Sequence, residues 1–184
     1  MKTLLTYLFI ASLCIPLYSC ASYNLSYVKS AEIKPKPNKL YILVTDSIPS
    51  ERYGINTSGS QNDFMVNLSK NISICLTQNG IKNRLKVHSE IYTLENDDDI
   101  SLKIKNYEPD AVMNVKREQS LLLSGKYGTG YNGGIYTITI TAMGDKKPYW
   151  KAIVETINEY YSSDAESTDL AKQVIDKLKA DGII

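Results

Sequence analysis

The chain has 184 residues, with 21 basic and 20 acidic side chains and a formal net charge of +1. This length suits one domain that buries a core of its own. Near neutrality without a basic block gives no electrostatic footprint for nucleic acid, and one histidine with three cysteines leaves little for metal or cysteine-histidine chemistry.

Residues 1–19 have the pattern of a secretory signal peptide, with Lys2, an apolar run over Leu4–Leu17 and small residues near the end. Pro16 interrupts this run, and the run is shorter than the roughly 20 apolar residues that span a bilayer. The segment LYSC, which ends at Cys20, resembles the lipobox of bacterial lipoproteins. An apolar residue stands three places before the cysteine and a small residue directly before it.

The lipobox resemblance implies cleavage before Cys20, a diacylglycerol on its sulfur and a further acyl chain, such as palmitate, on the new amino terminus. Several chains together make a stable membrane anchor. Ala21 and Ser22 lack the aspartate that retains such lipoproteins in the inner membrane of Gram-negative bacteria. The resemblance therefore implies an outer-membrane anchor on the periplasmic face. The alternative is an ordinary secretory signal, cleaved near Ser19 or Ala21, in which Cys20 is incidental.

Residues 20–38 are polar and contain the segment KPKPN, whose prolines oppose regular structure. They predict a lipidated tether, followed by a single α/β domain over residues 39–184. A short early strand over residues 26–31 is the alternative. The domain begins with a compact apolar run over Leu40–Val44, which is typical of a strand buried on both faces.

A helix is predicted over about residues 62–79, with Gly80 as its C-terminal stop. Its apolar face carries Cys75, the one thiol left after processing, which we expect to be a buried structural thiol. The next strand covers residues 84–92, RLKVHSEIY, and its alternation places His88 on the solvent side.

A short helix is predicted next, with Asn96 or Asp97 as its N-cap and Pro109 ending it. Its three aspartates, residues 97–99, lack the spacing of a calcium-binding loop and instead suit the positive end of a helix. A strand over residues 110–118 completes a β-α-β-α-β order, which predicts parallel pairing.

Three strand-like runs follow, SLLLSGKYG, IYTITITAMG and YWKAIVETI, and predict an antiparallel meander. The last segment, STDLAKQVIDKLKADGII, predicts a helix with Ser167 or Thr168 as its cap and Gly182 as its stop. The predicted fold class is α/β (α+β). It is a single mixed sheet of about five to six strands, with a parallel β-α-β-α-β part, an antiparallel meander and a C-terminal helix.

The stretch GTGYNGG, Gly128–Gly134, matches the G-x-G-x-x-G pattern of a dinucleotide-binding turn. Such a site needs a helix after the glycines, because the helix N-terminus holds the pyrophosphate. The residues after Gly134 instead alternate with threonines as in a strand. We therefore predict no cofactor and expect a hairpin, with Asn132-Gly133 as its tight turn.

A functional reading of the same hairpin is a mobile flap over Tyr127–Tyr136 that touches a partner. Its glycines would supply mobility and its tyrosines amphipathic contact area. The candidate binding surface comprises four aromatic residues: Tyr127, Tyr131, Tyr136 and Trp150.

The segment YTITITAMGDKKPYWKA, together with LYILVTD, EPDAVMNV and LAKQVIDKLKADG, resembles small bacterial lipoproteins of unknown function over most of residues 39–182. The arrangement is similar to the α/β domains of lipoproteins that activate penicillin-binding proteins and of curli-secretion lipoproteins. The resemblance implies an envelope protein that works by contact, without a catalytic centre, on an unidentified envelope protein or glycan.

No catalytic or metal-binding residue is predicted. Acidic residues near strand ends keep one enzymatic alternative open, because ligands favour the carboxyl ends of strands in open α/β sheets; they are Asp46, Glu51, Asp110 and Glu118. The leading hypothesis is a lipid-anchored, periplasmic, non-enzymatic binding or assembly accessory. The alternatives are a carboxylate-based envelope hydrolase and an oligomeric secretion component.

Overall fold

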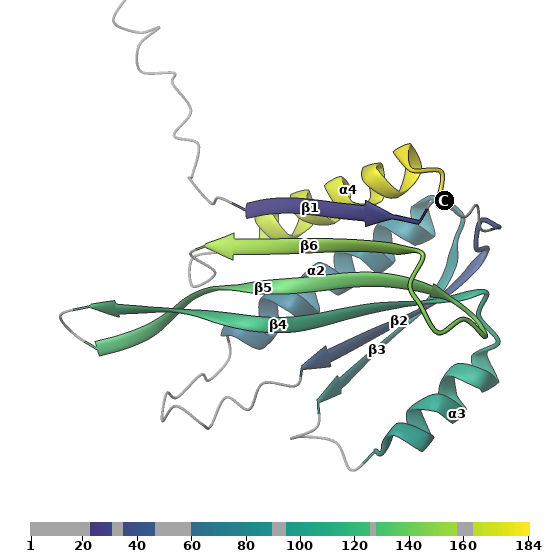
Figure 1. Cartoon of the computed structure of the whole chain (residues 1–184), viewed down its shortest axis with the longest axis horizontal. Coiled ribbons are helices and arrows are strands. Elements are labelled where there is room, and N and C mark those ends of the chain that lie inside the picture. Colours follow the sequence, from purple (N-terminus) through teal and green to yellow (C-terminus); the bar gives the residue numbers. More distant parts are fainter. Residues whose placement is uncertain (1–22, 31–34, 47–59, 90–94, 126–127, 158–163) are drawn as a thin grey trace, which may run out of the picture.

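A computed structural model describes residues 23–30, 35–46, 60–89, 95–125, 128–157 and 164–184. Within these ranges the chain forms one six-stranded sheet of order β1-β6-β5-β4-β2-β3 with three helices (Figure 1). The predicted α/β fold, with one mixed sheet and a C-terminal helix, is confirmed. The elements are β1 (Tyr23–Lys29), β2 (Lys39–Asp46), α2 (Ser60–Gln78), β3 (Lys82–Ser89), α3 (Asp97–Tyr107), β4 (Ala111–Gly125), β5 (Gly128–Ala142), β6 (Trp150–Ile157) and α4 (Asp164–Ala180).

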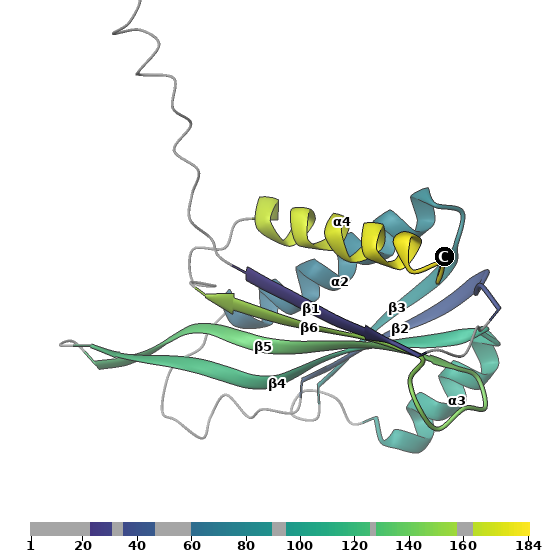
Figure 2. The same cartoon turned by 45° about the horizontal axis from the view of Figure 1, so that its top comes forward.

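The sheet has a parallel part and an antiparallel part. β2 pairs in parallel with β3 and with β4, whereas β4, β5, β6 and β1 pair antiparallel in that order. α2 and α4 lie together over one face, and α3 lies on the other (Figure 2). The chain steps outward from β2 to β3 and then back past β2 to β4. Because the two steps run in opposite directions, crossovers of one hand require helices on opposite faces.

β2 is buried on both faces, as its apolar run predicts. Leu40, Ile42 and Val44 are fully buried in the core beneath α2 and α4. Alternation along the strand turns Tyr41 to the opposite face, where the Tyr107 ring of α3 meets it edge-on with 5.8 Å between ring centroids. The parallel part of the sheet is thus covered by helices on both sides.

α4 covers the antiparallel part beside α2. Leu170, Val174 and Leu178 are fully buried in the same core cluster as Trp150 and Val154 of β6. α4 begins at Asp164, so the predicted caps Ser167 and Thr168 lie inside the helix. Both of their hydroxyls accept hydrogen bonds from the Asn71 side chain of α2, at 3.0 and 3.1 Å. These contacts join the two helices.

β1 lies inside the segment expected to be a tether. All seven of its residues pair with β6, from Tyr23 opposite Thr156 to Lys29 opposite Trp150. The sequence signal was weak because five of the seven side chains are exposed and only two pack against the core. The sheet therefore begins at Tyr23 and not at Lys39.

The expectation for His88 is wrong, since its side chain is only 5% exposed. It pairs in register with Thr45, on the sheet face where α3 packs, so a face that alternation assigns to solvent is covered here. Cys75 is a half-buried free thiol packed against the core from α2.

The helix ends follow local chemistry. Gly80 ends α2 with a φ of 78°, and the Ile81 amide donates to the Leu76 carbonyl as in a Schellman cap. Asn96 caps α3, as predicted, and exchanges hydrogen bonds with Asp99. Glu108 follows α3 with a φ of 50°, a left-handed conformation that favours glycine.

Glu108→Gly is expected to be more stable than Glu108→Ala by about 0.5–1 kcal/mol, because glycine removes the left-handed strain and gives back part of the gain as unfolded-chain entropy. The alanine variant is the matched control, since it removes the same carboxylate and keeps the Cβ. Urea unfolding of both variants measures the difference. Equal stability of the two would contradict the assignment of strain at this residue.

Candidate functional site at the β1 edge of the sheet

The predicted lipidation residue stands close to the folded sheet. Cys20 itself lies outside the described residues, and the first described residue, Tyr23, already opens β1. Two residues, Ala21 and Ser22, separate the two positions, so the chain takes three residue steps between them. At no more than about 3.6 Å per residue, an extended chain spans about 11 Å here. An anchor at Cys20 would therefore hold the start of β1 directly at the membrane surface.

β1 is an edge strand. It pairs with β6 on one side, and side chains of α4 also contact it. The Lys177 ammonium lies over the Tyr27 ring, 3.6 Å from its centroid. Near the end of β1, the Lys29 ammonium donates to the Asp181 backbone carbonyl at 2.7 Å. At its start, the Gln173 side chain donates to the Tyr23 hydroxyl. α4 and Asp181, which directly follows it, therefore contact β1 at three points along the strand.

Asp181 contacts two of the lysines that make these interactions, Lys29 and Lys177. Its carboxylate pairs with Lys177 at 2.6 Å and accepts a hydrogen bond from the buried Trp150 indole at 2.9 Å. Burial raises the pKa of Asp181, but the hydrogen bonds from Lys177 and Trp150 outweigh it and hold the pKa below its ordinary value. The ionised Asp181 side chain thus joins α4 to β6, and the Asp181 backbone carbonyl binds Lys29 of β1.

Two members of the expected aromatic surface are core residues. Tyr136 and Trp150 are 0% and 1% exposed, so neither offers a contact surface to a partner. Tyr136 packs against Phe64 of α2, with 5.6 Å between ring centroids, and the Arg117 guanidinium lies 5.7 Å from its ring. Strand alternation explains the error, because both aromatics fall on the sheet face that α2 and α4 cover.

The other two members are not placed by the structure. Tyr127 lies outside the described residues, and the side chain of Tyr131 in β5 is likewise not described. Of the four aromatic residues expected at the surface, only Tyr127 and Tyr131 therefore remain as candidates.

The glycine-rich stretch is part of a strand. Gly128–Gly134 belongs to β5, and no helix follows it, so the stretch lacks the geometry of a phosphate-binding turn. The turn expected at Asn132-Gly133 is wrong, since Gly133 pairs with both Leu121 and Ile157 inside the sheet.

Gly134 has a packing reason instead. A Cβ built there would lie 3.0–3.1 Å from the Tyr136 side chain, which lies over the glycine. The Gly134 amide donates to the Thr156 hydroxyl at 3.2 Å. A side chain at this position would require the buried Tyr136 ring to move by a few tenths of an ångström.

The candidate carboxylates do not gather at one point. Asp110 lies far from Asp46, whereas Glu118 follows Lys116, the register partner of Thr45, on the strand beside Asp46. Asp46 ends β2, whereas Asp110 precedes β4 and its amide donates to the Lys39 carbonyl at the start of β2. About seven residues of strand, roughly 23 Å, separate the two positions. Glu118 forms an exposed ion pair with Lys116 at 3.3 Å. Glu51 and the side chain of Asp46 lie outside the description.

A pocket of about 330 Å³ opens beside Asp110 and Tyr149, between the start of β4 and residues 35–38. The Asp110 carboxylate accepts the backbone amides of Asn38 and Lys39 at 2.7 and 2.9 Å. Burial, aided by the nearby Asp110 charge, raises the pKa of Tyr149 to about 12, so its phenol stays neutral. The Asp110 carboxylate thus holds the chain that enters β2.

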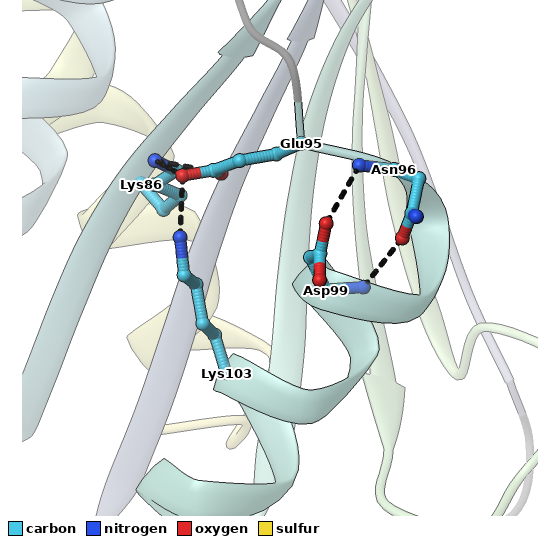
Figure 3. A network of polar contacts seen from close by, with 5 residues as sticks. All are labelled: Lys86, Glu95, Asn96, Asp99 and Lys103. Atoms are coloured by element: carbon cyan, nitrogen blue, oxygen red, sulfur yellow. Dashed lines mark hydrogen bonds and ion pairs between the residues drawn. The ribbon is translucent and has the colours of Figure 1, made fainter.

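A second charged cluster, which sequence reasoning missed, joins β3 to α3 (Figure 3). Glu95 lies between Lys86, at 2.9 Å, and Lys103. Hydrogen bonds from Lys103 and Lys86 lower the pKa of Glu95 to about 2. Glu95 directly precedes the Asn96 cap, and a Glu next to a capping box was the one available signal. The cluster fastens α3 to the sheet.

The described ranges contain no group of three histidine, cysteine or acidic side chains arranged to hold a metal ion. Among the helices that are described, none is long and apolar enough to cross a membrane.

No protein-family model and no curated protein matches the sequence. The solved structures that are similar to the chain include the following three. PelC from Paraburkholderia phytofirmans, solved as a dodecamer, is 11% identical over 84% of this chain and 95% of that chain, with a TM-score of 0.49. Lipoprotein GNA1162 from Neisseria meningitidis is 11% identical over 79% and 99%, with a TM-score of 0.44. A minor lipoprotein from Acinetobacter baumannii is 16% identical over 78% and 94%, with a TM-score of 0.33.

Lys177→Met is expected to speed hydrogen exchange at the β1 amides, because it removes the ion pair with Asp181 and the contact with the Tyr27 ring. Lys172→Met, on the exposed side of the same helix, is the matched control. Exchange followed by mass spectrometry resolves β1 from the rest of the sheet. Unchanged protection of β1 in Lys177→Met would show that β6 alone holds the strand.

Glu95→Gln is expected to destabilise the protein at pH 7, and this difference should vanish in acid. The folded pKa of about 2 lies below the ordinary value of 4.5, so ionised Glu95 stabilises the fold above about pH 4.5. That contribution is lost as the pH falls through about 2. Urea midpoints of wild type and variant across this range test it, and Glu118→Gln, from an exposed pair, is the control. A pH-independent difference would contradict the prediction.

Proposed function

We propose that this protein is a lipid-anchored, periplasmic accessory of the bacterial envelope that works by binding or assembly and not by catalysis. The observation that carries the proposal is the position of Cys20. A lipobox-like cysteine stands three residues before a strand that belongs to the folded sheet. Such an arrangement presents the domain to the membrane surface in a restricted orientation.

The contacts between α4 and β1 support attachment of the domain to a membrane through β1. A lipid at Cys20 transmits any pull on the domain into β1, and an edge strand with pairing on one side only is a weak attachment. The Lys177, Lys29 and Gln173 contacts reinforce that strand from outside the sheet. Ala21 and Ser22, which lack the inner-membrane aspartate, favour the outer membrane as the site of the anchor.

The candidate carboxylates favour a non-enzymatic role. Asp110 is engaged by two backbone amides, and Glu118 is paired at the surface. Asp46 lies at the opposite end of its strand from Asp110, so these two do not form the kind of carboxylate pair that hydrolysis of a glycan needs. Glu118 lies on the strand beside Asp46, but its carboxylate is engaged by Lys116.

Metabolic labelling with a clickable palmitate analogue tests the anchor. Wild type should take up label and Cys20→Ser should lose it, because the thioether and the processing both need this cysteine. Cys75→Ser is the matched control and should keep the label, since Cys75 is a half-buried thiol in the folded domain. Equal labelling of wild type and Cys20→Ser would sink the proposal.

The binding role needs a separate experiment. Cross-linking of intact envelopes followed by purification of the native protein should recover a defined envelope component. Light scattering of the purified protein distinguishes an accessory from a large oligomeric secretion component. Turnover of cell-wall material by the purified protein that is abolished in Asp46→Asn would instead establish the hydrolase alternative.

A further inference from the structure

We propose that the end of the β4–β5 hairpin rests in the lipid–water interface beside the anchor. This projecting hairpin comprises residues 119–125 of β4 and residues 128–133 of β5. The inference rests on the proposed attachment of the chain to a membrane at Cys20. It adds a second, non-covalent membrane contact made by the folded domain itself.

The register of the sheet places the hairpin and the anchor at the same end. Tyr23 of β1 pairs with Thr156, Thr156 with Gly134, and Gly134 with Ser120. These four residues form one row across the sheet. β1 begins at that row, and β4 and β5 continue past the row beyond the start of β1 (Figure 1).

The hairpin extends further beyond this row than the chain between Tyr23 and Cys20 can reach. From Ser120 to Gly125, five residues of strand at about 3.3 Å each carry the hairpin about 17 Å beyond the row. The three residue steps from Tyr23 back to Cys20 reach at most about 11 Å beyond it. β1 and β5 are separated only by β6, or about 10 Å across the sheet. A lipid on Cys20 therefore sets the hairpin end at or slightly below the membrane surface.

The composition of the hairpin suits that depth. Residues 120–134 include three consecutive leucines, Leu121 to Leu123, two tyrosines and five glycines. Lys126 is the one charged residue among them, and no acidic residue opposes contact with anionic headgroups. Tyrosine is enriched at membrane interfaces because its ring is apolar and its hydroxyl is polar.

The hairpin is too short to cross a bilayer. A projection of about 17 Å covers little more than half of a hydrocarbon core of about 30 Å. Its excess of about 6 Å over the reach of the anchor matches the roughly 5–10 Å to which interfacial segments are buried. The contact is thus interfacial and not spanning.

Depth-dependent fluorescence tests the inference. Leu122→Trp places a reporter on the hairpin, and Met143→Trp places the control on an exposed turn that follows the far end of β5. The native Trp150 is buried and contributes the same background to both variants. The chain beginning at Cys20, with Cys75→Ser, is coupled through Cys20 to a maleimide lipid in vesicles of phosphatidylethanolamine and phosphatidylglycerol.

Brominated lipids should quench Leu122→Trp emission and shift it to shorter wavelength, while Met143→Trp should behave as the parent protein does. Tyr131→Trp is a second hairpin reporter in case Leu122→Trp fails to reach wild-type thermal stability. Hairpin emission that stays insensitive to brominated lipid and open to aqueous iodide would overturn the inference. So would shielding from iodide that occurs in native envelopes but not in these vesicles, which would mean that a protein covers the hairpin.

The chemical coupling separates this test from that of the anchor. If palmitate labelling fails, the proposed function fails, yet the coupled protein still reports whether the hairpin enters lipid. If labelling succeeds and quenching does not occur, the anchor stands and the second contact is wrong.

Discussion

The structure depends on the fact that α2 and α4 cover only one face of the sheet over its antiparallel part. Each strand there must turn alternate residues toward the helices and the others toward the opposite face, so a single register error would exchange the two sets. The buried set includes Ile138, Ile140 and Val154, and the intervening threonines of β5 lie on the other face. β2 escapes this rule because α3 covers its second face, and its run is apolar throughout.

The same constraint explains the contacts between α4 and β1. β1 is the last strand on the side covered by α4, and it brings few apolar side chains to the core. Polar contacts stabilise the strand where little apolar surface is buried. Lys29 of β1 binds Asp181 just beyond the end of α4, and Asp181 also binds Lys177 and Trp150. The strand that follows the proposed anchor is therefore held by contacts with α4 and with Asp181, the residue that follows it. Residues 152 positions apart, Lys29 and Asp181, make this connection.

Local patterns predicted those elements whose signals are local. The cap at Asn96, the stop at Gly80 and the two periods of apolar residues all concern neighbours in sequence, and each was confirmed. Two local predictions were wrong, the cap at Ser167 or Thr168 and the turn at Asn132-Gly133. The other failures concern surfaces that a distant element covers. Tyr136 and Trp150 resemble contact residues until α2 and α4 are placed over them, and His88 resembles a solvent-facing residue until its face is covered. A polar strand such as β1 gives no signal unless β6 is known to lie beside it.

The sequence by itself determined the fold class, the order of the parallel elements and the absence of a helix after the glycines, because periodicity, caps and turn residues act over a few positions. It also contains the lipobox-like segment from which the anchor is proposed. Only the tertiary structure decided where that anchor would act. Strand register carries Tyr23 and the β4–β5 hairpin to one end of the sheet, and register is fixed by pairing between segments more than a hundred residues apart. A linear pattern holds no information about that row of residues until the strands are paired.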